Sequence, residues 1–264
     1  MTLMLPRLPT ILLATALLIA ACGGEDAVEP STTTMPTTST TTPPSTTTTE
    51  PRPVWEGFAA TNDAAPSLVA IANGPVDVFA EPGASEPKVT VDETTIMGTV
   101  TVLGVVTAPT TDGWVEVMLP MRPNGSTGWA RSDELSFYIA DSRIVVELGA
   151  RRLTYLVDDV PVLETEVGIG SVHNETPVGE FFVTDSVTLT DPTSPWGPHA
   201  LGLSARSNDI TEFNGGDGII GIHGTNNPSS IGGNISLGCV RLPNDMITAL
   251  HGLVPIGTRV EIRA

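Results

Sequence analysis

A low-complexity stretch separates the start of this sequence from the part that can fold. Residues 31–50 contain 12 Thr, 3 Ser and 3 Pro, and they show no apolar periodicity. Such a segment cannot bury enough apolar surface to offset the loss of chain entropy on folding. We therefore expect residues 23–65 to form a disordered linker, and the globular fold to begin after it.

The N-terminus carries the features of an export signal. Arg7 precedes an apolar run at residues 11–20, which is shorter than the roughly 20 residues that a membrane-spanning helix needs. The run ends in Ile-Ala-Ala-Cys22, which resembles a bacterial lipobox. This resemblance implies a lipoprotein signal peptide over residues 1–22, with acylation of Cys22 after cleavage. The alternative is an ordinary signal peptide with an incidental cysteine.

The two cysteines of the chain then have different fates. If lipid occupies Cys22, Cys239 has no intramolecular partner and lies outside the cytoplasm. An odd cysteine in an exported protein indicates either pairing with another molecule or a reactive thiol. Cys239 is therefore a candidate nucleophile.

Charge and composition exclude several partners. The chain has 30 acidic and 12 basic residues, and its formal net charge of −18 repels the phosphates of nucleic acids. We expect no nucleic-acid partner. The four histidines and two cysteines show no metal-ligand spacing, so we also expect no metal and no cofactor.

Residues 66–138 have the pattern of a small all-β domain, because short apolar runs alternate with Gly, Pro, Asp and Asn. Two Gly-Trp pairs give this region a resemblance to bacterial SH3-like domains, which implies a small β-barrel. We expect Trp114 and Trp129 to pack in its core, with an exposed ligand platform as the alternative. The predicted strands lie at residues 68–71, 76–79, 99–106 and 114–117.

Residues 141–264 predict a second domain that is mainly β with one short helix. The helix should run from residue 243 or 244 to about 253, with Pro in its first turn, Asp245 near its start and Gly257 beyond its end. The predicted strands are a hairpin at residues 143–148 and 153–157, followed by residues 180–183, 219–222 and 259–262.

A cysteine and a histidine in this second domain have the context of a catalytic pair. A predicted strand leads into His223, and Cys239 follows a loop rich in turn formers, so the chain can double back and bring the two together. A thiol with a pKa of about 8.5 is mostly protonated at neutral pH, and an adjacent imidazole can take its proton. We expect His223 to be this base, with its tautomer held by a backbone carbonyl such as that of Gly224.

The residues around this pair have weaker signals. Gly238 allows a tight turn before Cys239, so we expect N–H groups at these two residues to face a developing oxyanion. We expect His251 at the helix end, and His173 and His199 in loops. Trp196, in a Pro/Gly-rich loop, either borders a substrate site or serves only in packing.

The motifs HGT at residues 223–225 and SLGCVR at residues 236–241 resemble the signature of the L,D-transpeptidase (YkuD) family. Similar runs at residues 176–183, 200–204 and 213–218 extend the resemblance over residues 141–264. The resemblance implies a β-sandwich-like catalytic domain in which Cys239 attacks a peptidoglycan stem peptide, at the carbonyl between an L-centre and a terminal D-residue. It also implies Ser236 in the site wall, Arg241 against the site or a substrate carboxylate, and acylation of the cysteine by carbapenems.

One position departs from the family pattern, which usually has His where this chain has Leu237. We expect the rate or the acceptor preference to differ accordingly. Three functions stay open: a transpeptidase that passes the acyl group to an amine of a second stem, an L,D-carboxypeptidase that passes it to water, and a non-catalytic wall-binding lipoprotein. For each we expect an exported protein, lipid-anchored on the extracytoplasmic side of the membrane and facing the cell wall.

Overall fold

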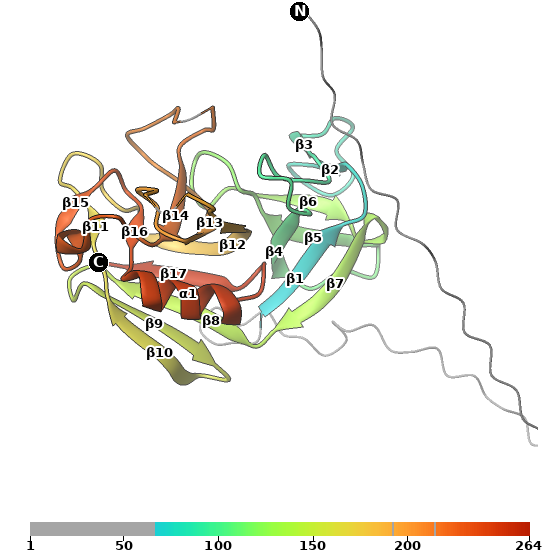
Figure 1. Ribbon diagram of the computed structural model, residues 1–264. Coiled ribbons are helices and arrows are strands. Elements are labelled where there is room, and N and C mark those ends of the chain that lie inside the picture. The colour runs from blue at the N-terminus through green and yellow to red at the C-terminus, as the bar shows by residue number, and fades with distance from the viewer. Residues whose placement is uncertain (1–66, 192, 214) are drawn as a thin grey trace, which may run out of the picture. The chain divides into compact units, whose positions relative to one another are not determined.

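The computed structural model of the protein describes residues 67–191, 193–213 and 215–264 (Figure 1). The predicted signal peptide, its Cys22 and the predicted linker lie outside these residues. In the part that is described, no helix has both the length and the apolar character needed to cross a membrane.

The first described residues form an antiparallel sheet with the strand order β6-β5-β4-β1-β7. A separate hairpin of two short strands and one 3-10 turn accompany it. The apolar core of this region comes from alternate strand residues such as Val115 and Val117, which are fully buried. The elements are β1 (Ser67–Ala72), β2 (Val76–Val78), β3 (Val89–Val91), β4 (Val102–Thr107), β5 (Trp114–Met118), β6 (Thr127–Arg131), η1 (Ser132–Glu134) and β7 (Leu135–Ala140).

The tryptophans of this sheet do not pack in its core, and that prediction was wrong. Trp114 and Trp129 are half-buried and lie outside the buried cluster. Because side chains alternate along β5, Val115 and Val117 take the inward positions and Trp114 faces outward. There it packs edge-on against Phe79, with ring centroids 5.5 Å apart, and under the guanidinium of Arg131 at 5.1 Å.

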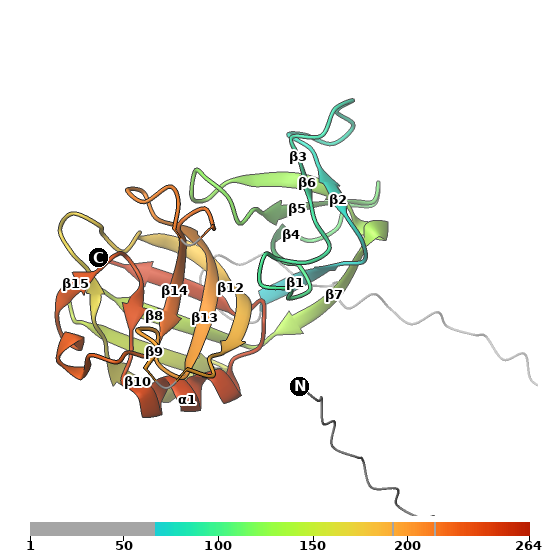
Figure 2. The ribbon, with the colours of Figure 1, turned by 45° about the horizontal axis from the view of Figure 1, so that its top comes forward.

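The remaining residues form a mixed sheet of eight strands in the order β10-β9-β8-β17-β12-β13-β14-β16, whose central strands Figure 2 shows side by side. The β8/β17 and β14/β16 pairs are parallel and the other pairs are antiparallel. The elements of the sheet are β8 (Ser142–Glu147), β9 (Arg152–Val157), β10 (Val160–Glu166), β12 (Gly179–Thr188), β13 (His199–Arg206), β14 (Ile219–His223), β16 (Val240–Arg241) and β17 (Arg259–Arg263). Outside it lie β11 (Ile169–Gly170), η2 (Pro228–Ser230), β15 (Asn234–Ser236) and α1 (Asn244–Leu253).

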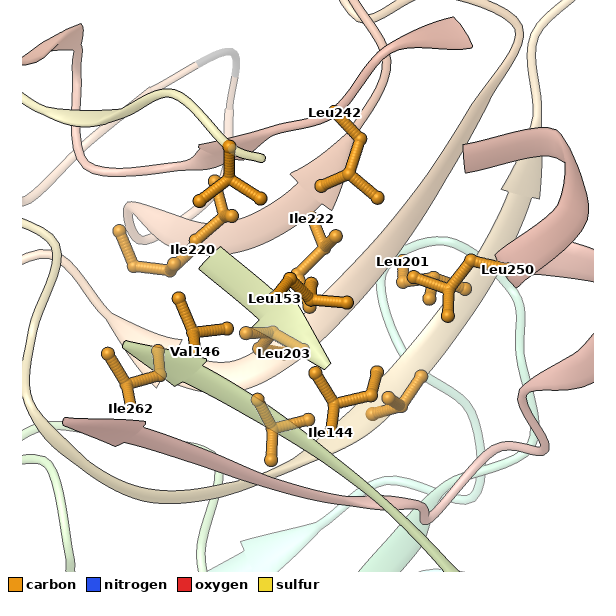
Figure 3. Packing of buried hydrophobic residues seen from close by; sticks show 14 of the residues in the cluster. Ile144, Val146, Leu153, Leu201, Leu203, Ile220, Ile222, Leu242, Leu250 and Ile262 are labelled. Carbon is orange, nitrogen blue, oxygen red and sulfur yellow. The ribbon is translucent and has the colours of Figure 1, made fainter. Parts of the chain in front are cut away.

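The eight-stranded sheet curls around one apolar core. Strand β12 makes this possible, because its first half pairs with β17 and its second half with β13, with an irregularity between Val183 and Asp185. Ile144 and Leu153 from one end of the sheet therefore share a buried cluster with Leu201 and Ile222 from the other end (Figure 3). The architecture is mainly β, as predicted.

Helix α1 covers this core through Ile247 and Leu250, which are fully buried (Figures 1 and 3). Its bounds confirm the predicted helix, and Asp245 and His251 lie in its first and last turns. The predicted strands also correspond to strands of the structure, with ends that differ by a few residues. His199 is an exception among the predicted loop residues, because it begins β13 and stacks on His251 with ring centroids 4.1 Å apart.

Candidate active site

The parallel pairing of β14 with β16 determines which side chains meet. Ile222 lies opposite Val240, and both point into the apolar core. His223 lies opposite Arg241, so alternation along the strands places both side chains on the other face of the pair. Cys239 immediately precedes β16 and shares that face, where its Sγ accepts a hydrogen bond from the N–H of Gly221 at 3.4 Å. A thiol, an imidazole and a guanidinium therefore emerge together from two neighbouring strands.

The tautomer of His223 is determined by a contact to its neighbour. Nδ1 lies 2.6 Å from the carbonyl oxygen of Gly224. A carbonyl oxygen only accepts hydrogen bonds, so Nδ1 must carry the hydrogen and donate it. In the neutral ring, Nε2 then keeps its lone pair and is available as a proton acceptor.

Burial makes both members of the pair neutral at pH 7. It lowers the pKa of His223 to about 4, an effect opposed by the Gly224 carbonyl and reinforced by the nearby positive charge of Arg241. Burial also raises the pKa of the Cys239 thiol, while the Gly221 N–H and Arg241 act in the opposite direction. The resting site therefore holds a protonated thiol and an unprotonated imidazole on one face of the β14/β16 pair.

The turn that carries Cys239 is braced by buried hydroxyl groups. Ser236 Oγ donates to the carbonyl of Cys239 at 2.6 Å and accepts from the N–H of Gly238 at 3.1 Å. Thr176 Oγ1 donates to the carbonyl of Gly238 at 2.8 Å. Gly238 has φ +112°, and a Cβ added there would lie 2.8 Å from the side chain of Ile220. The glycine is required by this conformation, and its N–H is taken by Ser236 rather than free to face an oxyanion.

The backbone of Gly224 sits in a close-packed pocket made by the start of α1. The side-chain oxygen of Asn244 accepts from the N–H of Thr225 at 2.8 Å, and a Cβ added to Gly224 would lie only 2.4 Å from that oxygen. The same Cβ would meet Pro198 at 3.0 Å. The carbonyl that orients His223 is thus held in place from two sides.

Arg241 brings a positive charge to the site. Among the residues that the structure describes, its Nε is a buried polar atom without a hydrogen-bond partner. A ligand cannot reach an atom that is buried in this way, so Arg241 acts on the site through its positive charge, which matches a carboxylate.

One aromatic side chain borders the imidazole, and a second packs against the first. The ring of Trp196 lies 6.4 Å from that of His223, and the ring of Phe213 lies 6.5 Å from Trp196. On the exposed side, Leu237 leaves 49% of its surface accessible, two residues before the thiol. An exposed apolar side chain therefore stands where the family pattern has a histidine.

Sequence reasoning identified His223, Cys239 and their immediate neighbours, but it missed the residues that support them. Thr176 bonds to Gly238, which is 62 positions away, and Asn244 bonds to Thr225, which is 19 positions away, so local sequence patterns do not reveal these partners. 

Such contacts depend on the tertiary fold. The only signal for Thr176 in the sequence was its place in a run that resembles the family.

The domain that holds these residues is similar to known proteins. The L,D-transpeptidase catalytic domain of the YkuD family matches residues 141–262. The L,D-transpeptidase YkuD of Bacillus subtilis is 34% identical over 125 residues, which cover 47% of this chain and 68% of that protein. The chain belongs to the YkuD family of L,D-transpeptidases.

Other relatives carry the same family name. The L,D-transpeptidase YqjB of Bacillus subtilis is 32% identical over 132 residues, covering 46% of this chain and 71% of that protein. Among solved structures, L,D-transpeptidase 3 of Mycobacterium tuberculosis, in complex with a faropenem-derived adduct, has a TM-score of 0.40 at 14% identity. That alignment covers 63% of this chain and 92% of that chain.

Proposed function

We propose that this protein is a peptidoglycan L,D-transpeptidase with Cys239 as its nucleophile and His223 as its base. One observation carries the proposal: the Gly224 carbonyl holds the hydrogen on Nδ1 of His223, which leaves Nε2 unprotonated on the strand face that also bears the thiol. Family membership supports the same assignment, because YkuD relatives are L,D-transpeptidases and the family fits peptidoglycan cross-linking.

The first half-reaction forms a thioester. Sγ of Cys239 attacks the carbonyl carbon between the L-centre and the terminal D-residue of a stem peptide, while Nε2 of His223 takes the thiol proton. The tetrahedral intermediate then collapses, the C–N bond breaks, and the imidazolium returns the proton to the leaving amine, so that D-alanine departs. A base that is neutral at pH 7 suits this sequence, since only the unprotonated ring can accept the thiol proton.

The second half-reaction resolves the thioester. The side-chain amine of a second stem's diamino acid attacks the acyl carbon and gives its proton to Nε2. The C–S bond breaks, the sulfur leaves as a thiolate, and the proton held by His223 restores the thiol. The products are a cross-linked stem pair and the free enzyme.

Two residues support the charges that develop in these steps. The N–H of Gly238 is occupied by Ser236, so we assign oxyanion stabilisation to the N–H of Cys239 itself, in the turn that Ser236 and Thr176 brace. The positive charge of Arg241, on the same strand face as His223, suits the carboxylate of a stem peptide.

Two other functions are the alternatives to cross-linking. An L,D-carboxypeptidase would pass the acyl group to water, and the exposed Leu237 beside the thiol bears on this choice, because the usual histidine is missing from the mouth of the site. A non-catalytic wall-binding lipoprotein would catalyse neither half-reaction.

Incubation of the protein with defined tetrapeptide stems distinguishes the three functions. We expect cross-linked dimers and released D-alanine by mass spectrometry, with no product from Cys239→Ala. Tripeptides as the only product would indicate an L,D-carboxypeptidase. Unchanged stems would indicate a non-catalytic wall-binding protein.

The location of this activity is a separate proposal, which rests on the sequence motif at Cys22. The protein would be exported, lipid-anchored through that residue and held against the cell wall by the Thr/Pro-rich segment. Cys22→Ser should move the protein from the membrane fraction to the soluble exported fraction, and an unchanged membrane fraction would contradict the anchor.

A further inference from the structure

A loop of the N-terminal sheet hydrogen-bonds to a loop of the catalytic domain. Arg122, between β5 and β6, donates through Nη2 to the carbonyls of Ser207 and Ile210 at 3.1 and 2.8 Å, and through Nε to that of Ser207 at 3.2 Å. Asn124 pairs with both backbone groups of Arg206: Nδ2 donates to its carbonyl at 2.7 Å, and Oδ1 accepts from its N–H at 2.8 Å. Both side chains therefore hydrogen-bond to the backbone at the end of β13 and just after it.

The segment they hold is the β13–β14 loop, defined here as residues 207–213 and 215–218. Most of its side chains are exposed, so the loop has little apolar core of its own. It closes tightly on Arg122: a Cβ added to Gly218, at φ +73°, would lie 2.0 Å from the carbonyl oxygen of Ile210 and 2.7 Å from Nη2 of the arginine. The loop is therefore held by its own bonds, such as the one from the N–H of Ser207 to the carbonyl of Gly218 at 2.8 Å, together with the contacts of Arg122 from outside it.

The same loop reaches the active site. The backbone groups of Phe213 and Gly216 exchange two hydrogen bonds of 2.9 Å, which fixes a small turn at its tip. The ring of Phe213 then lies 6.5 Å from Trp196, whose own ring lies 6.4 Å from that of His223. The backbone of the loop therefore connects the residues that Arg122 bonds to with the aromatic rings beside the imidazole.

We propose that Arg122 and Asn124 are positioning residues for the active site, which hold the β13–β14 loop so that Phe213 and Trp196 form an apolar wall for the bound acyl donor beside His223. This inference rests on the proposed function. The physical basis is that catalysis is sensitive to small displacements of groups around the reacting atoms. The N-terminal sheet thus takes part in substrate positioning.

The test uses the full-length protein and the rate constant for acylation by a carbapenem, followed by intact-protein mass spectrometry. Arg122→Ala and Phe213→Ala should each slow acylation about five- to tenfold, as expected for a displaced contact next to the reacting groups. The double variant should be no slower than the slower single variant, because both substitutions disrupt the same wall. Arg131→Ala is the matched control, since that arginine bonds to the Asp112 carbonyl within its own sheet.

A second measurement separates positioning from loss of fold. Alkylation of Cys239 by iodoacetamide needs the thiolate and access to it, but no apolar wall for a bound acyl donor, so it should not slow in Arg122→Ala. Phe213 is 44% exposed, so its alanine variant should fold even if Arg122→Ala does not. Wild-type acylation rates in Phe213→Ala, or losses that multiply in the double variant, would overturn the inference. A wild-type protein that is not acylated at all would instead count against the proposed function.

Discussion

The imidazole of His223 lies where a positive charge is disfavoured, so the stability of the protein should fall as the pH falls through the window from 6.5 to 4. The perturbation that reveals this is His223→Asn, which removes the titrating ring and keeps an N–H donor near the Gly224 carbonyl. Groups other than His223 titrate in both proteins, so their effects largely cancel in the difference between wild type and variant.

The sign and size of the effect follow from the pKa of this histidine. Burial lowers it from 6.5 to about 4, so between these values the unfolded chain binds a proton that the folded protein does not. Stability is then lost as the pH falls, by about 1.4 kcal/mol per pH unit and about 3 kcal/mol over the whole window. Below pH 4 this contribution should not change further, because both states are protonated.

Urea unfolding of wild type and His223→Asn at several pH values from 7 to 4 measures the difference. Wild type should lose about 3 kcal/mol relative to the variant over this range. Carbapenem acylation should report the same group, with an acid limb at about pH 4. A stability difference that does not change with pH, together with an acid limb near the ordinary histidine pKa of 6.5, would refute the buried neutral base.

Three further substitutions test other parts of the site. Gly224→Ala should destabilise the protein by about 1–3 kcal/mol in thermal unfolding and slow acylation, because its Cβ would lie 2.4 Å from the Asn244 oxygen. Ser236→Ala should cost about 1–3 kcal/mol by leaving a buried N–H and the Cys239 carbonyl without their partner, and a variant of wild-type stability would contradict the bracing role. Leu237→His should change stability by less than about 0.5 kcal/mol, since the side chain is half exposed, but should raise the ratio of dimer to tripeptide products.

Local patterns predicted most of the elements of the catalytic domain. The helix was predictable because Pro243, Asp245 and an apolar face mark its start and its buried side. The hairpin of β8 and β9 was predictable from two apolar runs around a turn, where Arg151 adopts φ +53°. Signals of this kind reside in neighbouring residues, so the tertiary fold is not needed to interpret them.

Features that depend on long-range pairing were not predictable. The outward position of Trp114 follows from the inward positions of Val115 and Val117, and composition alone favoured burial of the large ring. His199 belongs to a strand because β13 pairs with β12 and β14, not because of its own Pro/Gly-rich surroundings. The motif around Cys239 was recognisable, but the commitment of the Gly238 N–H to a serine hydroxyl required the folded turn.

The central claim is that Cys239 is the nucleophile and His223 its base. The most direct measurement is the mass of the intact protein after exposure to a carbapenem, with peptide mapping of the adduct in wild type, Cys239→Ala and His223→Asn. Our account predicts one adduct on Cys239 in wild type, none in Cys239→Ala, and a rate at least about 100-fold lower in His223→Asn. An adduct on another residue, or equal rates in wild type and His223→Asn, would contradict it.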